Sequence, residues 1–172
     1  MLSRGELAYF AYGSNLLFAR LHARTPSIRN LGVARLDDHR LHFNKPGGDG
    51  SGKCGIEGAI PGEHVLGVAY AIHRSEKPLL DEIEGVGHGY AERWVDVCQG
   101  SEIISAFTYY PTRHDHALLP FDWYRNFVLQ GARENNFPVD YIARIASVEV
   151  VVDPDEKRRN HNYGISQRGP AP

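Results

Sequence analysis

The sequence predicts an α+β protein built on a small, partly closed β-barrel with flanking helices. Several short apolar runs, separated by turns rich in Gly and Pro, have the composition of strands. A few other segments repeat apolar residues at helical spacing. With 172 residues and 42% hydrophobic content, the chain is long enough for one domain with a substantial core. We expect that domain to span 1–152, followed by a polar tail over 153–172.

The first half of the chain is expected to be mostly strands. An aromatic run at 7–12 is stopped by Gly13, which suits a buried strand. Leu16 to Leu21 then contains good helix formers. Further strands are expected at 32–43, 55–60 and 64–72, of which the last is almost continuously apolar and therefore central.

The second half is expected to alternate helices with a pair of strands. Ser75 is placed to cap a helix that runs through Ile83 and is broken by glycines at 85, 87 and 89. Strands at 90–98 and 102–110 follow, and then helices at 120–135 and 138–145. From Asp153 the chain is polar and ends in Gly169-Pro170-Ala171-Pro172, so we expect the tail to be weakly structured.

The composition argues against several classes of partner. There are 19 basic and 21 acidic side chains, for a formal net charge of -2, whereas nucleic acids and anionic membranes attract a basic surplus. No apolar run approaches the roughly 18–20 residues that span a bilayer. Two cysteines cannot make a disulfide framework in a chain of this size. We therefore expect a cytoplasmic protein with neither nucleic acid nor membrane as partner.

The segment Tyr12-Gly13-Ser14-Asn15-Leu16 is the first candidate for chemistry. It joins a strand end to a helix start, where successive backbone N–H groups converge and the helix dipole adds positive potential. Such a turn suits a carboxylate or an oxyanion. The spacing alone also fits an ordinary capped turn without function.

Glu84 is the second candidate, because it ends a predicted helix beside Gly85. Negative charge is unfavourable near a helix C-terminus, and ionisable groups in awkward positions are candidates for function. A solvated acidic helix end is the alternative, and this feature alone favours that alternative.

Two other motifs are weaker. Gly47 to Lys53 has the spacing of a phosphate-binding loop, but Cys54 replaces the Ser or Thr that would hold magnesium, and Gly55 follows where a helix should begin. This stretch is better explained as a flexible loop. His114 and His116 offer two imidazoles without an obvious third ligand, so we expect no metal site.

Taken together, Tyr12-Gly13-Ser14-Asn15-Leu16 and Leu80-Asp81-x-x-Glu84-Gly85-Val86 resemble the paired motifs of the γ-glutamylcyclotransferase family. Further similarity lies in Val33 to Phe43, in 64–72 and in Gly131 to Asn135. The resemblance covers about 7–145 and is specific because both motifs occur in order at this separation. One departure is that the stretch from Gly85 to Tyr90 is one residue shorter than in the animal enzyme of the family.

The resemblance implies a small mixed α/β barrel and a homodimer. Glu84 falls on the catalytic glutamate of the family, and the main chain of Gly13, Ser14, Asn15 and Leu16, beside Tyr12, would hold the γ-glutamyl group. Tyr109 and Tyr124 match tyrosines near the family's pocket, and the shorter stretch leaves the role of Tyr90 open.

The implied reaction is the intramolecular cyclisation of a γ-glutamyl amino acid or related amine to 5-oxoproline. The attacking α-amine belongs to the substrate, so no metal, nucleotide or other cofactor is required. Glu84 would take a proton from the α-ammonium and return it to the departing amine. Two alternatives stay open: an enzyme for a different γ-glutamyl amine, and a non-catalytic module that binds a small molecule on the same scaffold.

Overall fold

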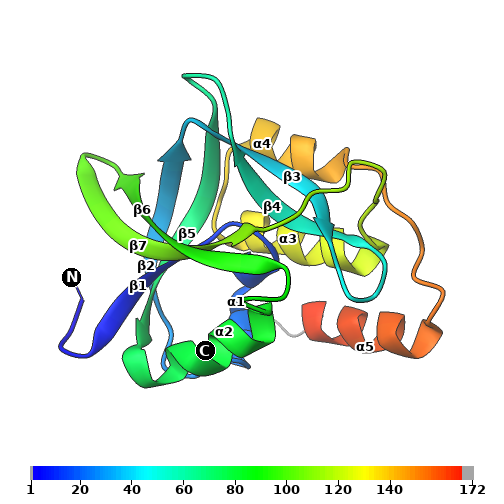
Figure 1. Cartoon of the computed structure of the whole chain (residues 1–172), viewed down its shortest axis with the longest axis horizontal. Coiled ribbons are helices and arrows are strands. Elements are labelled where there is room, and N and C mark those ends of the chain that lie inside the picture. The colour runs from blue at the N-terminus through cyan, green and yellow to red at the C-terminus, as the bar shows by residue number, and fades with distance from the viewer. Residues whose placement is uncertain (1, 168–172) are drawn as a thin grey trace.

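A five-stranded β-barrel forms the centre of the computed structural model, which describes residues 2–167 (Figure 1). The strands follow the order β1-β5-β2-β6-β7, with β1 at Glu6–Ala11, β2 at Arg29–Asp37, β5 at His64–His73, β6 at Tyr90–Gln99 and β7 at Glu102–Pro111. Neighbours pair antiparallel except β1 and β7, which pair in parallel at Tyr9 and Phe107. The predicted mixed barrel is confirmed, and the parallel pair closes it completely.

Strands β3 (His39–Pro46) and β4 (Gly52–Gly58) form a separate two-stranded ribbon. The single strand expected over 32–43 is wrong, because the chain turns between β2 and β3 at Asp38, whose φ is +56°. Aspartate adopts this left-handed conformation more readily than most residues. The glycine-rich stretch that begins at Gly47 closes the β3–β4 hairpin, with the Gly47 N–H donating to the Ser51 carbonyl at 2.8 Å. It leads into a strand, so it lacks the helix that a phosphate-binding loop requires.

Five α-helices flank the barrel in the described chain, with α1 and α2 below it and α3, α4 and α5 to its right in Figure 1. They are α1 (Phe18–His22), α2 (Lys77–Glu84), α3 (Asp122–Glu134), α4 (Val139–Ala146) and α5 (Glu156–Ser166), with 3₁₀ turns at Ser14–Leu16 and Arg74–Glu76. The helix expected to be capped by Ser75 begins later, at Lys77, with Pro78 in its first turn. The Ser75 N–H donates instead to the His73 imidazole at 3.3 Å, within the preceding 3₁₀ turn.

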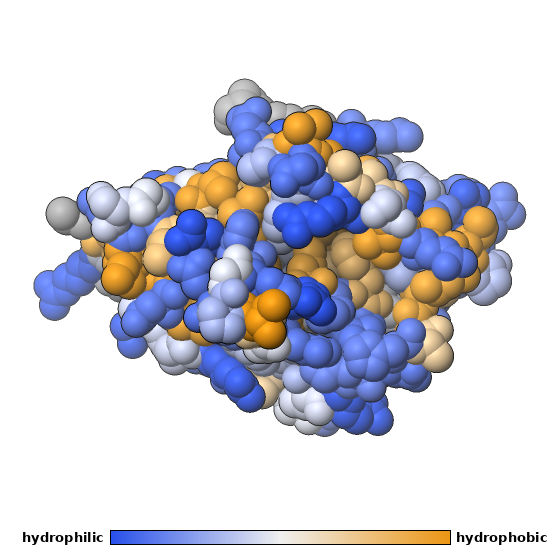
Figure 2. Space-filling view, turned by 90° about the horizontal axis from the view of Figure 1, so that it is seen from above, coloured by the Kyte–Doolittle hydropathy of each residue, from blue (hydrophilic) through white to orange (hydrophobic). Residues whose placement is uncertain are grey.

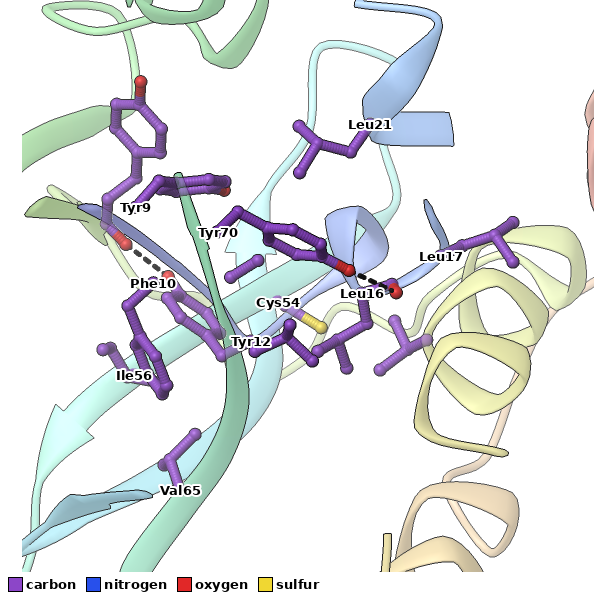
Figure 3. Close-up of a cluster of buried hydrophobic side chains, with 14 of the residues drawn as sticks. Tyr9, Phe10, Tyr12, Leu16, Leu17, Leu21, Cys54, Ile56, Val65 and Tyr70 are labelled. Atoms are coloured by element: carbon purple, nitrogen blue, oxygen red, sulfur yellow. Dashed lines mark hydrogen bonds between the residues drawn. The ribbon is translucent and has the colours of Figure 1, made fainter. Parts of the chain in front are cut away.

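Helix α3 supports the turn that follows β1. Its buried face includes Tyr124, Phe127 and Val128, as the helical spacing predicts. Gly131 permits close packing, because a Cβ atom there would lie 2.5 Å from the Leu16 main chain. From the barrel, Tyr70 donates a hydrogen bond of 3.2 Å to the Leu16 carbonyl (Figure 3). The turn at Ser14–Leu16 is therefore held between the barrel and α3.

The expectation of a weakly structured tail is wrong for α5. Asp153 lies just before this helix, and its fully buried carboxylate accepts hydrogen bonds of 2.7 Å from Trp123 Nε1 and from Arg158 Nε. Asp153 thus connects Trp123 on α3 with Arg158 on α5. The polar composition of the segment gives no sign of these long-range hydrogen bonds. The expected end at 169–172 lies outside the described residues, and the proposed domain boundary at 152 stays a prediction.

The face that carries α4 and the turn between β4 and β5 mixes hydrophobic and hydrophilic side chains (Figure 2). Over residues 2–167, none of the helices combines the length and the hydropathy needed to cross a membrane.

Candidate active site

The two sequence motifs meet at the carboxylate of Glu84. Glu84 is the last residue of α2, and Gly85 ends the helix in the left-handed conformation with φ +74°. Oε1 of Glu84 accepts hydrogen bonds from Asn15 Nδ2 at 3.0 Å and from Arg24 Nη1 at 2.7 Å. The Glu84 side chain is only 16% exposed. Glu84 is therefore a paired, largely buried carboxylate, and the solvated acidic helix end that the sequence favoured is wrong.

Asn15 and Arg24 hold each other as well as Glu84. Arg24 Nη1 also donates to Asn15 Oδ1 at 3.0 Å, and Asn15 Nδ2 also lies 3.0 Å from the Tyr9 hydroxyl. The guanidinium offsets the unfavourable position of Glu84 at a helix C-terminus. In the described chain no group bonds to Oε2 of Glu84, so this oxygen can accept a proton or a hydrogen bond from a ligand.

A small inner cavity lies beside Glu84. Its lining combines both motifs with tyrosines from the barrel and from α3: Tyr9, Tyr12, Gly13, Ser14, Asn15, Cys54, Glu84, Tyr90, Tyr109 and Tyr124. The volume is about 30 Å³. That volume is too small for a γ-glutamyl amino acid, so a substrate needs the adjoining space as well.

Three of the five tyrosine hydroxyls donate their protons within the protein. Tyr12 donates to the Tyr109 carbonyl, Tyr90 to the Cys54 carbonyl, and Tyr109 to Asp81 Oδ1 at 2.7 Å. These bonds fix the ring positions and use up the donors. Tyr90, whose role the sequence leaves open, thus forms part of the cavity wall.

The other two hydroxyls act as acceptors. Tyr9 accepts from Asn15 Nδ2, and Tyr124 accepts from the Cys54 backbone N–H at 3.0 Å. Burial raises the pKa of both hydroxyls, and the negative charge of Glu84 adds to the effect. Tyr9 and Tyr124 therefore remain protonated and can each donate a hydrogen bond into the cavity.

The turn after β1 brings main-chain groups to the same place. Ser14 and Asn15 begin the 3₁₀ turn, where N–H groups have no partner within the helix. Gly13 fits closely, because a Cβ atom there would lie 2.9 Å from Cys54 Cβ. Leu16 is different: its N–H donates to the Gly13 carbonyl at 2.9 Å, its side chain is buried in the core, and it does not line the cavity.

The cavity contains a thiol that is not set up as a nucleophile. Burial raises the pKa of Cys54 to about 12, so it is a neutral thiol at physiological pH. Over residues 2–167, no group of three or more His, Cys, Asp or Glu side chains is placed to hold a metal ion. His114 lies elsewhere, with Nδ1 2.6 Å from Glu57 Oε1.

The inner cavity adjoins a second hollow of about 170 Å³, and Ser14, Glu84, Tyr90 and Tyr124 line both. The rest of its lining is mostly basic or glycine: Arg20, Arg24, Lys45, Gly47, Gly48, Lys53 and Ile83. A larger hollow of about 460 Å³ lies between α4 and β3, on the side of the molecule seen in Figure 2. Its lining includes neither motif, so size does not identify the site.

Curated relatives that share one name, γ-glutamylcyclotransferase, match most of the chain. A γ-glutamylcyclotransferase of Bos taurus is 36% identical over 148 residues, which cover 82% of this chain and 78% of the relative. The Homo sapiens γ-glutamylcyclotransferase matches with the same identity and coverage. The chain belongs to the γ-glutamylcyclotransferase family. The family model described as AIG2-like matches residues 64–145.

A solved structure supports the same membership. A structure named γ-glutamyl cyclotransferase superposes with a TM-score of 0.82 at 30% identity, covering 92% of this chain and 99% of the other. Within this γ-glutamylcyclotransferase fold, one cavity brings together all the site residues predicted from the sequence except Leu16: Tyr12, Gly13, Ser14, Asn15, Glu84, Tyr90, Tyr109 and Tyr124.

Sequence reasoning missed Tyr9, Arg24 and Cys54. Tyr9 is three residues before Tyr12 in an aromatic run whose composition predicts a buried strand, and nothing in that run distinguishes a hydroxyl that lines a cavity from a core side chain. Arg24 lies 60 positions from Glu84 and follows α1, so only the folded chain brings the two together.

Proposed function

We propose that this protein cyclises a γ-glutamyl amino acid or a related γ-glutamyl amine to 5-oxoproline and releases the amine. The observation that carries the proposal is the meeting of Glu84 with the Tyr12–Asn15 turn in one tyrosine-lined cavity. The curated relatives named γ-glutamylcyclotransferase support the same reaction class. Glu84 is the proposed catalytic residue, and Asn15 and Arg24 position it.

The reaction begins with a proton transfer to Glu84. The substrate's α-ammonium loses a proton to Oε2, the carboxylate oxygen that no protein group occupies. The free amine then attacks the γ-carbonyl carbon and forms the C–N bond of a five-membered ring. Because nucleophile and carbonyl are in one molecule, most of the entropic cost of bringing them together is absent.

The tetrahedral intermediate carries an oxyanion that needs hydrogen-bond donors. The hydroxyls of Tyr9 and Tyr124 retain their protons and face the cavity, so they are the proposed donors. The Ser14 and Asn15 amides are then left for the α-carboxylate of the γ-glutamyl group. When the amide C–N bond breaks, Glu84 gives its proton to the departing nitrogen. The ring nitrogen still carries a second proton of the former ammonium, which Glu84 takes and passes to the released amine, so the enzyme ends in its starting state.

A panel of γ-glutamyl compounds tests this function. Purified protein is incubated with γ-glutamyl amino acids, glutathione and γ-glutamyl-lysine, and 5-oxoproline is detected by mass. The proposal expects equimolar 5-oxoproline and free amine from at least one compound without added metal or nucleotide. No product from any of them would favour the non-catalytic binding module.

A homodimer and a cytoplasmic location complete the proposal. Light scattering during gel filtration measures the mass of the particle directly, and the proposal expects twice the 19.2 kDa of one chain. Fractionation of cells that express the protein tests its location, and the proposal expects it with the cytoplasmic markers.

A further inference from the structure

The hollow that adjoins Glu84 has a strongly basic lining, and we name it the cationic chamber. Arg20, Arg24, Lys45 and Lys53 line it, and Glu84 is the one acidic residue among the described residues of its wall. A concave surface with this lining favours a negatively charged occupant.

Two of the four cations already have carboxylate partners. Arg24 pairs with Glu84 at 2.7 Å, and Lys53 Nζ pairs with Asp49 Oδ2 at 2.7 Å. Lys53 also contacts the Ser51 hydroxyl at 2.7 Å. Their charges are therefore largely neutralised within the protein.

Lys45 has no carboxylate in ion-pair contact within residues 2–167, although only 9% of the residue is exposed. Its Nζ lies 4.3 Å from the centre of the Tyr90 ring, which is shared by both cavities. Burial lowers the pKa of this lysine, Glu84 and Asp49 attract it from a greater distance, and Arg113 repels it. A ligand carboxylate here would supply the partner that the protein does not.

Of the four cations that line the chamber, Arg20 is the second that has no carboxylate partner among the described residues. Its guanidinium stacks on Phe127, with 4.5 Å from Cζ to the ring centre, and its Nε is buried without a hydrogen bond. Burial lowers the pKa of Arg20 to about 10, so it still carries its charge at neutral pH. A buried N–H donor without a hydrogen bond is costly, and a ligand carboxylate beside the guanidinium would lower that cost.

We propose that the cationic chamber binds the departing amine, and that this amine is an acidic amino acid whose side-chain carboxylate meets Lys45 and whose α-carboxylate meets Arg20. The inference rests on the proposed function. The α-carboxylate of the γ-glutamyl group is assigned there to the Ser14 and Asn15 amides, and Glu84 stands where the two cavities join. The bond that breaks beside Glu84 therefore releases the amine on the chamber side, where a basic amine such as lysine would be repelled.

Two peptides of nearly equal shape test the proposal: γ-glutamyl-glutamate and γ-glutamyl-glutamine. They differ in one carboxylate, which is an amide in the second peptide. The wild-type protein is expected to have a kcat/KM at least about tenfold higher for γ-glutamyl-glutamate, the size of one charged hydrogen bond. Lys45→Met should remove most of this preference by slowing the glutamate peptide, and Lys45→Arg should retain it. Lys157→Met, which removes an exposed charge on α5, should leave the preference unchanged.

The outcomes separate the two proposals. Equal kcat/KM for the two peptides, or a Lys45→Met variant that slows both equally, would overturn the chamber's specificity while 5-oxoproline production upheld the proposed function. If neither peptide nor any compound of the wider panel yields 5-oxoproline, the proposed function fails and the specificity assignment falls with it.

Discussion

The side-chain amide of Asn15 donates a 3.0 Å hydrogen bond to Oε1 of Glu84 and thereby joins two sequence motifs that are 69 residues apart. The bond leaves the other carboxylate oxygen without a protein partner in the described chain. The same oxygen that is held also accepts from Arg24. This arrangement fixes the direction in which Glu84 can exchange a proton.

Asn15→Ala should therefore lower kcat more than it raises KM. The substitution removes donors to both Glu84 and Tyr9, and a loosened carboxylate spends less time in the reactive orientation. We expect kcat to fall about tenfold or more, given the size of a hydrogen bond to a charged group. Asn126→Ala on α3 is the matched control, because it removes a hydrogen bond to Ser166 outside the cavity. An unchanged kcat in Asn15→Ala would contradict the positioning role.

Arg24→Ala should also reduce kcat, and added guanidinium ion should restore part of it. The guanidinium reaches Glu84 and Asn15 from one nitrogen atom, so a small cation of the same shape can replace it. We expect a loss of about tenfold or more in steady-state assays. Arg35→Ala breaks an exposed pair with Asp37 and should leave activity unchanged. Loss of activity without any rescue would point to a structural role for Arg24.

Tyr124→Phe and Tyr12→Phe should differ in their effects on catalysis. The Tyr124 hydroxyl keeps its proton for the cavity, whereas the Tyr12 hydroxyl donates to the Tyr109 carbonyl. We expect Tyr124→Phe to lower kcat by about 100-fold, the cost of losing one oxyanion donor. Tyr12→Phe should mainly lower the free energy of unfolding, by about 1 kcal/mol. Thermal unfolding and kinetics on both variants decide the matter, and equal losses of kcat would refute the distinction.

Asp153→Asn should destabilise the fold at neutral pH. The Arg158 hydrogen bonds lower the pKa of Asp153 in the folded protein, and Trp123 adds to the effect. A lowered folded pKa means that the carboxylate stabilises the fold above its unfolded pKa of about 4 and loses that contribution as the pH falls. We expect a loss of about 2 kcal/mol near pH 7, after allowance for the partial exposure of Arg158.

Denaturant titrations of the wild type and Asp153→Asn over a range of pH measure this effect. The difference in unfolding free energy should shrink as the pH drops below about 4. A difference that stays constant with pH would show that the charge of Asp153 contributes nothing. Asp140→Asn, an exposed change on α4, serves as the control.

The sequence predicts four of the five barrel strands and both motifs. Strand periodicity identified β1, β5, β6 and β7, since their apolar runs are bounded by turn residues. Local pattern marked Glu84 and the Tyr12–Asn15 turn as candidates, but on its own it favoured an ordinary helix end and an ordinary capped turn. The resemblance then added that both segments belong to one site.

The rest depended on contacts between distant segments. Arg24 carries no local sign of its ion pair, and the pairing of Arg158 with Asp153 made an ordered helix of a segment that composition alone marks as polar. Lys45 lies near the end of β3, just before the glycine-rich stretch, and carries no local sign of a role, although folding places it against Tyr90. The chain reversal at Asp38 could not be predicted, because this turn uses an aspartate in the left-handed conformation and not a glycine. Local pattern reports secondary structure, whereas the charge environment of a cavity is set by tertiary packing.

Glu84→Gln tests the central claim most directly. Glutamine keeps the size and the acceptor oxygen for Asn15 and Arg24 but cannot carry a proton between the amine groups. We expect 5-oxoproline formation to fall at least about 100-fold, while calorimetry shows substrate still bound and the unfolding temperature changes little. Glu82→Gln, an exposed change two residues earlier on α2, should keep full activity. Near wild-type turnover by Glu84→Gln would contradict the account, since another group would then carry the proton.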